Sequence, residues 1–185
     1  MSQFEFVLVL MSFVVAFAIS EILAGWGRQF AERDHVKPSG LQLMASALLL
    51  LALVQGLWGY WSYRDLDWTL GRFLIAFLPL LVLSTSAFFI TPHISDRGVS
   101  DAREHYMRVR SVLFTLLSAY VILNTLTEWT LSGLVPHGGQ AIRPVAIAIF
   151  VALAVSRDPR IHWAGLTILL ILQAAFALMV TPSLG

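Results

Sequence analysis

Long apolar segments fill most of this chain, and they constrain its fold more than any other feature. We identify six, at residues 4–27, 41–61, 69–91, 110–132, 142–156 and 161–181. In a lipid bilayer only a helix or a closed barrel satisfies every backbone hydrogen-bonding group. These segments are too long and too uniformly apolar for barrel strands. The pattern therefore predicts an all-α integral membrane protein, a six-helix transmembrane bundle.

The length of the chain favours a single domain. It has 185 residues, of which 58% are hydrophobic and 12% are charged. A helix needs about 20 apolar residues to cross the hydrocarbon, so six helices and their connections occupy the whole sequence. We therefore expect residues 1–185 to form one transmembrane domain. The absence of cysteine excludes disulfides, thiolate metal ligands and a cysteine nucleophile.

Basic residues alternate between the two ends of the predicted helices. Of the twelve Lys and Arg residues, nine lie at the first, third and fifth connections and three at the second and fourth. Cytoplasmic loops carry the excess of Lys and Arg, so we expect the odd-numbered connections in the cytoplasm and both termini outside. The residues that we expect to contact anionic lipid headgroups are Arg28, Arg33, Lys37, Arg103, Arg108, Arg110, Arg157 and Arg160.

The fifth segment is the shortest of the predicted spans. Its apolar run covers residues 144–155, and runs of about 10–14 apolar residues are often re-entrant or buried. A turn-rich stretch at 132–140 precedes it. A short helix with an irregular lead-in would leave an outward-facing hollow. We favour the alternative, an ordinary loop followed by a helix with little tilt.

Helices one and four share a sequence pattern. Residues 12–26 align with residues 115–129 at Ser/Thr, Ala, Phe/Tyr, Ile, Leu and Trp positions. Two three-helix units in tandem have opposite topology, as in many transporters. The match suggests a weak 3+3 inverted repeat. We favour the alternative, chance similarity between apolar helices, since helices two and five show no comparable match.

Glu21 is the clearest ionisable residue inside a predicted span, and such residues are costly in the bilayer and often mark a site. Ser20 precedes it in the chain. Helix three carries hydroxyl groups at a similar depth, at Ser84, Thr85 and Ser86, and we expect them to donate to the carboxyl group. Because desolvation disfavours the charged form, Glu21 is expected to be mainly protonated and able to exchange protons, as a coupled transporter requires. The alternative is a neutral glutamate that ties two helices together.

A second polar group lies near the outer face and comprises Gln55, Arg72, Asn124 and Glu128. Asn124 and Glu128 are four residues apart and therefore share one helix face. We expect an Arg72–Glu128 ion pair in this cluster. Its alternative role is an interfacial clamp with snorkelling side chains. Gln173, near the middle of helix six, is placed to join either cluster.

The chain shows no constellation of residues for catalysis. Its five histidines lie in loops or at helix ends, which disfavours haem ligation, and Lys37 lies in a loop. No phosphate-binding glycine loop and no metalloprotease helix motif occurs. We therefore expect no enzyme activity, no cofactor, no metal site and no nucleic-acid partner. The expected partners are membrane lipids and a second copy or another membrane protein, because glycines at 25, 27, 56 and 59 permit close helix approach.

Four segments carry a resemblance to other proteins, and they are Glu5–Leu23, Trp61–Phe73, Asp101–Arg110 and Arg157–Trp163. In these segments the chain resembles a group of uncharacterised bacterial polytopic inner-membrane proteins with no assigned activity. The resemblance implies a multi-pass protein of the bacterial inner (plasma) membrane. It transfers no catalytic residue.

These observations lead to a functional hypothesis. We predict a small integral membrane protein that acts as a transporter or channel, with Glu21 as its proton- or ion-responsive group. The alternative is a non-catalytic membrane subunit or scaffold that packs against a partner or itself. A membrane enzyme acting on lipid ranks third, because no nucleophile–base pair is visible.

Overall fold

The computed structural model is almost entirely helical and describes residues 2–31, 36–91, 100–132 and 142–179. The helices in these ranges are α1 (Gln3–Ala31), α2 (Gly40–Gly59), α3 (Leu70–Ile90), α4 (Ala102–Ser132), α5 (Ile142–Val155) and α6 (Pro159–Met179). A 3-10 turn, η1 (Tyr60–Tyr63), extends α2. Two-residue strands, β1 (Val36–Lys37) and β2 (Ser100–Asp101), pair in parallel. The predicted all-α bundle is confirmed in its six helices.

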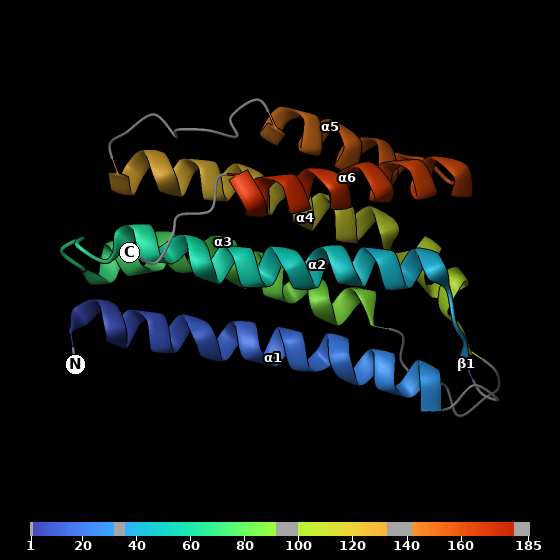
Figure 1. Ribbon diagram of the computed structural model, residues 1–185, viewed down its shortest axis with the longest axis horizontal. Helices are drawn as coiled ribbons and strands as arrows, with labels where there is room; N and C mark the ends of the chain where they lie inside the picture. The colour runs from blue at the N-terminus through green and yellow to red at the C-terminus, as the bar shows by residue number, and fades with distance from the viewer. Residues whose placement is uncertain (1, 32–35, 92–99, 133–141, 180–185) are drawn as a thin grey trace.

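The helices lie side by side and alternate in direction (Figure 1). We call the end of the bundle that holds η1 the η1 end, and the opposite end, where β1 and β2 pair, the β1 end. α1 begins and α6 ends toward the η1 end (Figure 1). The two ends of the described chain therefore lie toward the same end of the bundle, as an even number of alternating helices requires.

Five of these helices are long and apolar enough to cross a membrane: α1, α2 with η1, α3, α4 and α6. α5 has 14 residues, which is a length of about 21 Å. The hydrocarbon core of a bilayer is about 30 Å thick. α5 is therefore too short to cross it as a helix by itself, and the prediction of six full spans holds for five.

α4 begins eight residues before the predicted span, at Ala102. Asp101 explains this start, because its Oδ1 accepts hydrogen bonds from the backbone N–H groups of Arg103 (2.8 Å) and Glu104 (3.2 Å). A carboxylate in this position satisfies donors that the first helical turn leaves unpaired. The amphipathic stretch before the apolar run is thus the first part of the same helix.

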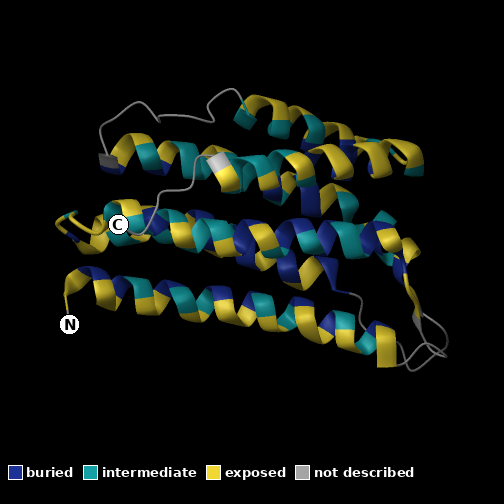
Figure 2. Ribbon diagram, in the orientation of Figure 1, coloured by how far each residue is buried: buried dark blue, intermediate teal, exposed yellow. Residues whose placement is uncertain are grey.

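α1 buries one narrow stripe of residues at intervals of three and four, which is the spacing of one helix face. Its buried residues are Phe4, Val7, Met11, Val15, Ala18, Ile22, Gly25 and Gln29. Apolar side chains such as Phe13 and Phe17 are exposed on the other faces, and the other helices also expose large apolar residues. Figure 2 shows exposed positions along the outer faces of the helices. Exposed apolar side chains all along a helix are the expected outer surface of a bundle in lipid.

Pro79 lies inside α3 and removes one backbone donor from the helix. The carbonyl that loses its donor belongs to Ile75, four residues earlier. Thr127 of α4 donates its hydroxyl to this oxygen at 3.1 Å. The hydroxyl of Tyr60 donates to the neighbouring carbonyl of Ala76. Side chains from α4 and η1 therefore satisfy the backbone beside the proline and fix these elements to α3.

Candidate functional site

Glu21 pairs with Arg28 of the same helix. Arg28 Nη2 lies 3.0 Å from Glu21 Oε1, and the side chains are 34% and 24% exposed respectively. Residues seven apart lie two turns along one helix face, so the contact is local to α1. Ser20 beside it is exposed. The carboxyl group therefore has a cationic partner near the bundle surface instead of a set of hydroxyl donors.

The predicted contact between Glu21 and the α3 hydroxyls is wrong. Thr85 and Ser86 each donate to the backbone carbonyl four residues earlier in α3, at 2.8 and 3.1 Å. Ser84 is buried, and its hydroxyl has no hydrogen-bond partner among the described residues. Serine and threonine in helices commonly bond back to their own backbone, which is the physical reason for the error. The proposed role of Glu21 as a proton site stays a prediction.

A cavity of about 200 Å³ lies between α2, α4, α5 and α6, on the side of the η1 end. Its residues nearest the η1 end include Tyr63, Glu128 and Arg143. Its deeper wall is apolar and is formed by Leu48, Ala52, Leu117, Phe150 and Leu169. α5 begins only partway along the bundle (Figure 1), and this short helix borders a hollow of the kind that a short fifth helix would leave. Residues 133–140 of the turn-rich stretch before it, predicted as an ordinary loop, lie outside the described residues.

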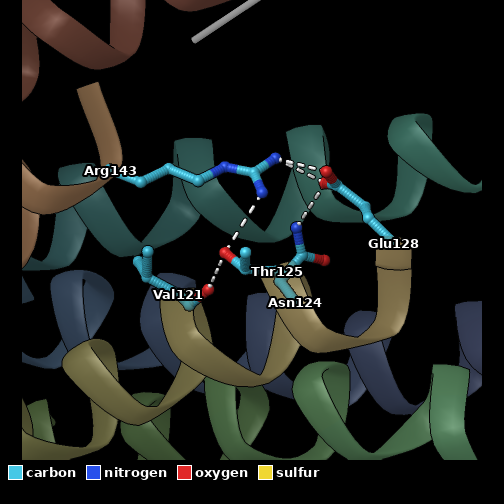
Figure 3. Close-up of polar contacts among 5 residues, drawn as sticks. All are labelled: Val121, Asn124, Thr125, Glu128 and Arg143. Atoms are coloured by element: carbon cyan, nitrogen blue, oxygen red, sulfur yellow. Dashed lines mark hydrogen bonds and ion pairs between the residues drawn. The ribbon is translucent and has the colours of Figure 1, made fainter. Parts of the chain in front are cut away.

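Arg143 and Glu128 form an ion pair at the edge of this cavity. Arg143 Nη2 lies 2.5 Å from Glu128 Oε1 and 2.7 Å from Oε2. Arg143 Nη1 donates to Thr125 Oγ1 at 3.1 Å, and Asn124 Nδ2 donates to Glu128 Oε1 at 3.0 Å. Figure 3 shows the arginine reaching from α5 to Thr125 and Glu128 of α4, with Asn124 of α4 bonded to Glu128. Both charged side chains are less than a quarter exposed, so water screens the pair only in part.

The predicted Arg72–Glu128 ion pair is therefore wrong. Arg72 lies in the first turn of α3, and its Nη1 donates to the backbone carbonyl of Asp67 at 2.6 Å. It is exposed, and it does not line the cavity. Glu128 pairs with Arg143 because α4 packs against α5 on the face that carries Glu128. A cation in the first turn of a helix opposes the helix dipole, so Arg143 needs an anionic partner.

Gln55 of α2 and Gln173 of α6 join across the cavity wall. Gln55 Nε2 donates to the Gln173 backbone carbonyl at 3.0 Å, and Gln173 Nε2 donates to Gln55 Oε1. Gln173 thus belongs to the outer cluster, one of the two clusters it was predicted to join. Gln55, Asn124 and Glu128 of that cluster all line the cavity. The sequence grouped these three correctly and missed Arg143.

Two tyrosine hydroxyl groups at the cavity have no hydrogen-bond partner among the described residues, those of Tyr63 and Tyr120. Tyr120 is held close to α2 because Gly56 has no side chain. A Cβ at Gly56 would lie 3.3 Å from the Tyr120 hydroxyl oxygen. Buried or half-buried hydroxyls usually find a partner, so these two are available to a ligand.

The cavity is closed toward the β1 end. The next layer of α4, α5 and α6 includes Leu113, Leu153 and Leu166, and none of them is more than 1% exposed. Below this layer the Tyr106 hydroxyl lies 2.6 Å from His162 Nδ1, and His162 Nε2 lies 3.1 Å from the Ser156 carbonyl oxygen. Because a carbonyl only accepts, Nε2 carries the proton and Tyr106 donates to Nδ1. The cavity therefore does not form a continuous pore.

The basic residues of the β1 end differ in their surroundings. Lys37, Arg103, Arg157 and Arg160 are exposed, and Arg33 lies outside the described residues.

Three further arginines of that end make contacts within the protein. Arg108 pairs with Glu104 at 2.7 Å on the surface of α4. Arg28 holds Glu21, and Arg110 donates its Nε to the Ser156 carbonyl oxygen at 2.8 Å. Arg28 and Arg110 therefore use their guanidinium groups for contacts within the protein, and Lys37, Arg103, Arg157 and Arg160, whose cationic groups have no partner among the described residues, are the better candidates for lipid contacts.

Among the described residues no group of three or more metal-ligating side chains comes together. Comparison with known proteins adds no further constraint, since no family model, no curated protein and no solved structure matches this chain.

Proposed function

We propose that this protein is a small membrane transporter, and that the cavity between α2, α4, α5 and α6 is its solute site. Its helical bundle, with five helices able to span a membrane, fits an integral membrane protein. The observation that carries the proposal is the cavity itself. It combines an apolar wall with an ion pair, an amide pair and two hydroxyl groups that have no hydrogen-bond partner in the part of the chain that the structure describes. Solute sites are typically mostly apolar with a few polar groups that orient the ligand.

A carrier fits this cavity better than an open channel does. The cavity begins near the η1 end and stops at the layer of Leu113, Leu153 and Leu166. A channel requires a continuous polar path, whereas a carrier exposes one site to each side in turn. The cavity then represents the state of the carrier that is open toward the η1 end.

The basic residues give this state an orientation. Nine of the twelve Lys and Arg residues belong to the first, third and fifth connections, and those of the nine that the structure describes lie toward the β1 end. The excess of Lys and Arg marks the cytoplasmic side, so we place the β1 end in the cytoplasm and the cavity mouth outside. We keep the bacterial inner membrane as the location and anionic lipids as partners of the β1 end.

We also propose that the protein self-associates. Fewer glycines are available for this contact than the sequence suggested. Gly25 and Gly56 are used inside the bundle, where an added Cβ would meet Thr91 and Tyr120. At Gly27 and Gly59 an added Cβ would meet nothing within 4 Å. These two positions are where a second copy is able to approach closely. The competing function, a non-catalytic subunit, would use the same contacts without transport.

A matched pair of variants on α5 tests the proposal. Ala146 lines the cavity, and Ala148 is exposed on the same helix outside it. Proteoliposomes are to be assayed for uptake of radiolabelled, membrane-impermeant solutes: a sugar, an amino acid, an organic anion and an organic cation. We expect uptake of at least one solute, lost in Ala146→Leu and retained in Ala148→Leu. No uptake of any solute would favour the subunit, and equal uptake by both variants would show that the solute does not pass through this cavity.

A further inference from the structure

The cavity carries two opposite charges side by side, and this limits the charge of any ligand. Arg143 and Glu128 satisfy each other at 2.5 and 2.7 Å. A ligand with a single charge would take one of them and leave the other without its partner in a partly buried site, which is costly. A ligand that carries both charges replaces the one ion pair with two, one to Arg143 and one to Glu128. Each residue then keeps an opposite charge beside it.

Both charged residues have the geometry to change partners. The Nε of Arg143 has no hydrogen-bond partner among the described residues, so one edge of the guanidinium is open to the two-point contact that carboxylates make. Glu128 is positioned by Asn124, which donates to its Oε1. The Tyr63 and Tyr120 hydroxyls line the same cavity and are available to donate to a carboxylate.

The rest of the cavity sets the size and polarity of the ligand. An engineered cavity of about 150 Å³ in another protein holds benzene, and this one measures about 200 Å³. The deeper wall of Leu48, Leu117, Phe150 and Leu169 offers no hydrogen-bonding side chain. A branched aliphatic group fits this wall, with its charged end at the ion pair.

We propose that the ligand is a small zwitterion with one apolar side chain, of the α-amino acid type. Its carboxylate binds Arg143, its ammonium group binds Glu128, and its side chain occupies the apolar wall. A zwitterion crosses hydrocarbon poorly because it carries two charges, so it requires a carrier to cross a membrane. The inference rests on the proposed function and adds the class of solute.

Three probes of similar size test which charges a ligand must carry in order to bind. Leucine carries both, isocaproate lacks the ammonium group, and isoamylamine lacks the carboxylate. Binding of tritiated leucine to the full chain in nanodiscs is measured in competition with the other two. We expect saturable leucine binding, and affinities for isocaproate and isoamylamine that are at least about tenfold weaker, since each breaks the Arg143–Glu128 ion pair and replaces only one of its two charges. Equal affinities for all three, or a preference for either singly charged probe, would overturn the inference.

Two substitutions extend the test and keep its outcomes distinct. Glu128→Gln should weaken leucine binding and raise the relative affinity for isocaproate, whereas a residue with a purely structural role would change no preference between probes. Ala146→Leu should abolish leucine binding and Ala148→Leu should not. Selective leucine binding without transport would contradict the proposed carrier and leave the site chemistry standing. Transport of another solute without leucine binding would support the proposed carrier and overturn the zwitterion as its ligand. The wild-type comparison does not depend on any variant folding.

Discussion

Arg143, in the first turn of α5, contacts both carboxylate oxygens of Glu128 in the last turns of α4. This contact ties a helix too short to span the bilayer to one that is long enough. It also places both charges at the edge of the cavity. The stability of the bundle and the chemistry of its candidate site therefore depend on the same two residues.

Replacing one member of this pair should cost more stability than replacing both. Arg143→Gln or Glu128→Gln leaves a partly buried charge without its partner. The side chains are 18% and 23% exposed. The cost should thus fall between the roughly 1 kcal/mol of a surface pair and the roughly 3–5 kcal/mol of a fully buried one. Thermal unfolding in nanodiscs measures it. Strictly additive losses in the double variant would show that the two residues do not interact energetically.

Thr127→Val should destabilise the protein by about 1–3 kcal/mol, because Pro79 supplies no backbone donor to the Ile75 carbonyl and the Thr127 hydroxyl is its hydrogen-bond donor. The matched control is Thr130→Val in the same helix. Thr130 is exposed and bonds only to its own helix, at the Leu126 carbonyl oxygen. Denaturant titration of both variants checks the difference. Equal losses would mean that the contact beside Pro79 contributes nothing specific.

Two glycines of α1 should respond oppositely to alanine. At Gly25 a Cβ would lie 2.7 Å from Thr91 Cγ2, so Gly25→Ala forces α1 and α3 apart and should lower the melting temperature. At Gly27 nothing lies within 4 Å, and Gly27→Ala should leave stability unchanged or raise it by up to about 1 kcal/mol through helix propensity. A loss at Gly27 as large as that at Gly25 would contradict this packing.

Tyr106→Phe should lower stability by about 1–2 kcal/mol, since it removes the donor to the buried His162 Nδ1. Tyr63→Phe is the control, because the Tyr63 hydroxyl has no hydrogen-bond partner among the described residues. Thermal unfolding without ligand compares the two. If Tyr63→Phe is the more damaging variant, the Tyr106–His162 hydrogen bond does not contribute to stability as described.

The sequence predicted the helices well because each apolar segment is long and uniform, and a buried backbone has few alternatives to a helix. It failed for α5 as a span, although the short run at 144–155 was visible. The sidedness of the termini and the 3+3 repeat stay predictions. Neither follows from packing alone.

The partners of charged residues were harder to predict, for a physical reason. Glu128 lies within reach of different helices depending on how α4 rotates, and depth alone favoured Arg72. Arg143 was counted only as a loop charge. One signal was present: Arg143 immediately precedes Pro144, and proline favours the first helical turn. Glu21 was assigned to α3 because the i, i+7 partner Arg28 was treated as a lipid contact.

The most direct test of the central claim uses the absence of native cysteine. Ala146→Cys in the cavity and Ala148→Cys outside it are each labelled with a membrane-impermeant thiol reagent, applied in turn to either side of sealed membranes. A carrier predicts that Ala146→Cys reacts from the outside in the resting state and also from the cytoplasmic side as the site alternates. Ala148→Cys should stay unreactive from both sides. Reaction of Ala146→Cys from one side only, or from neither, would contradict transport through this cavity.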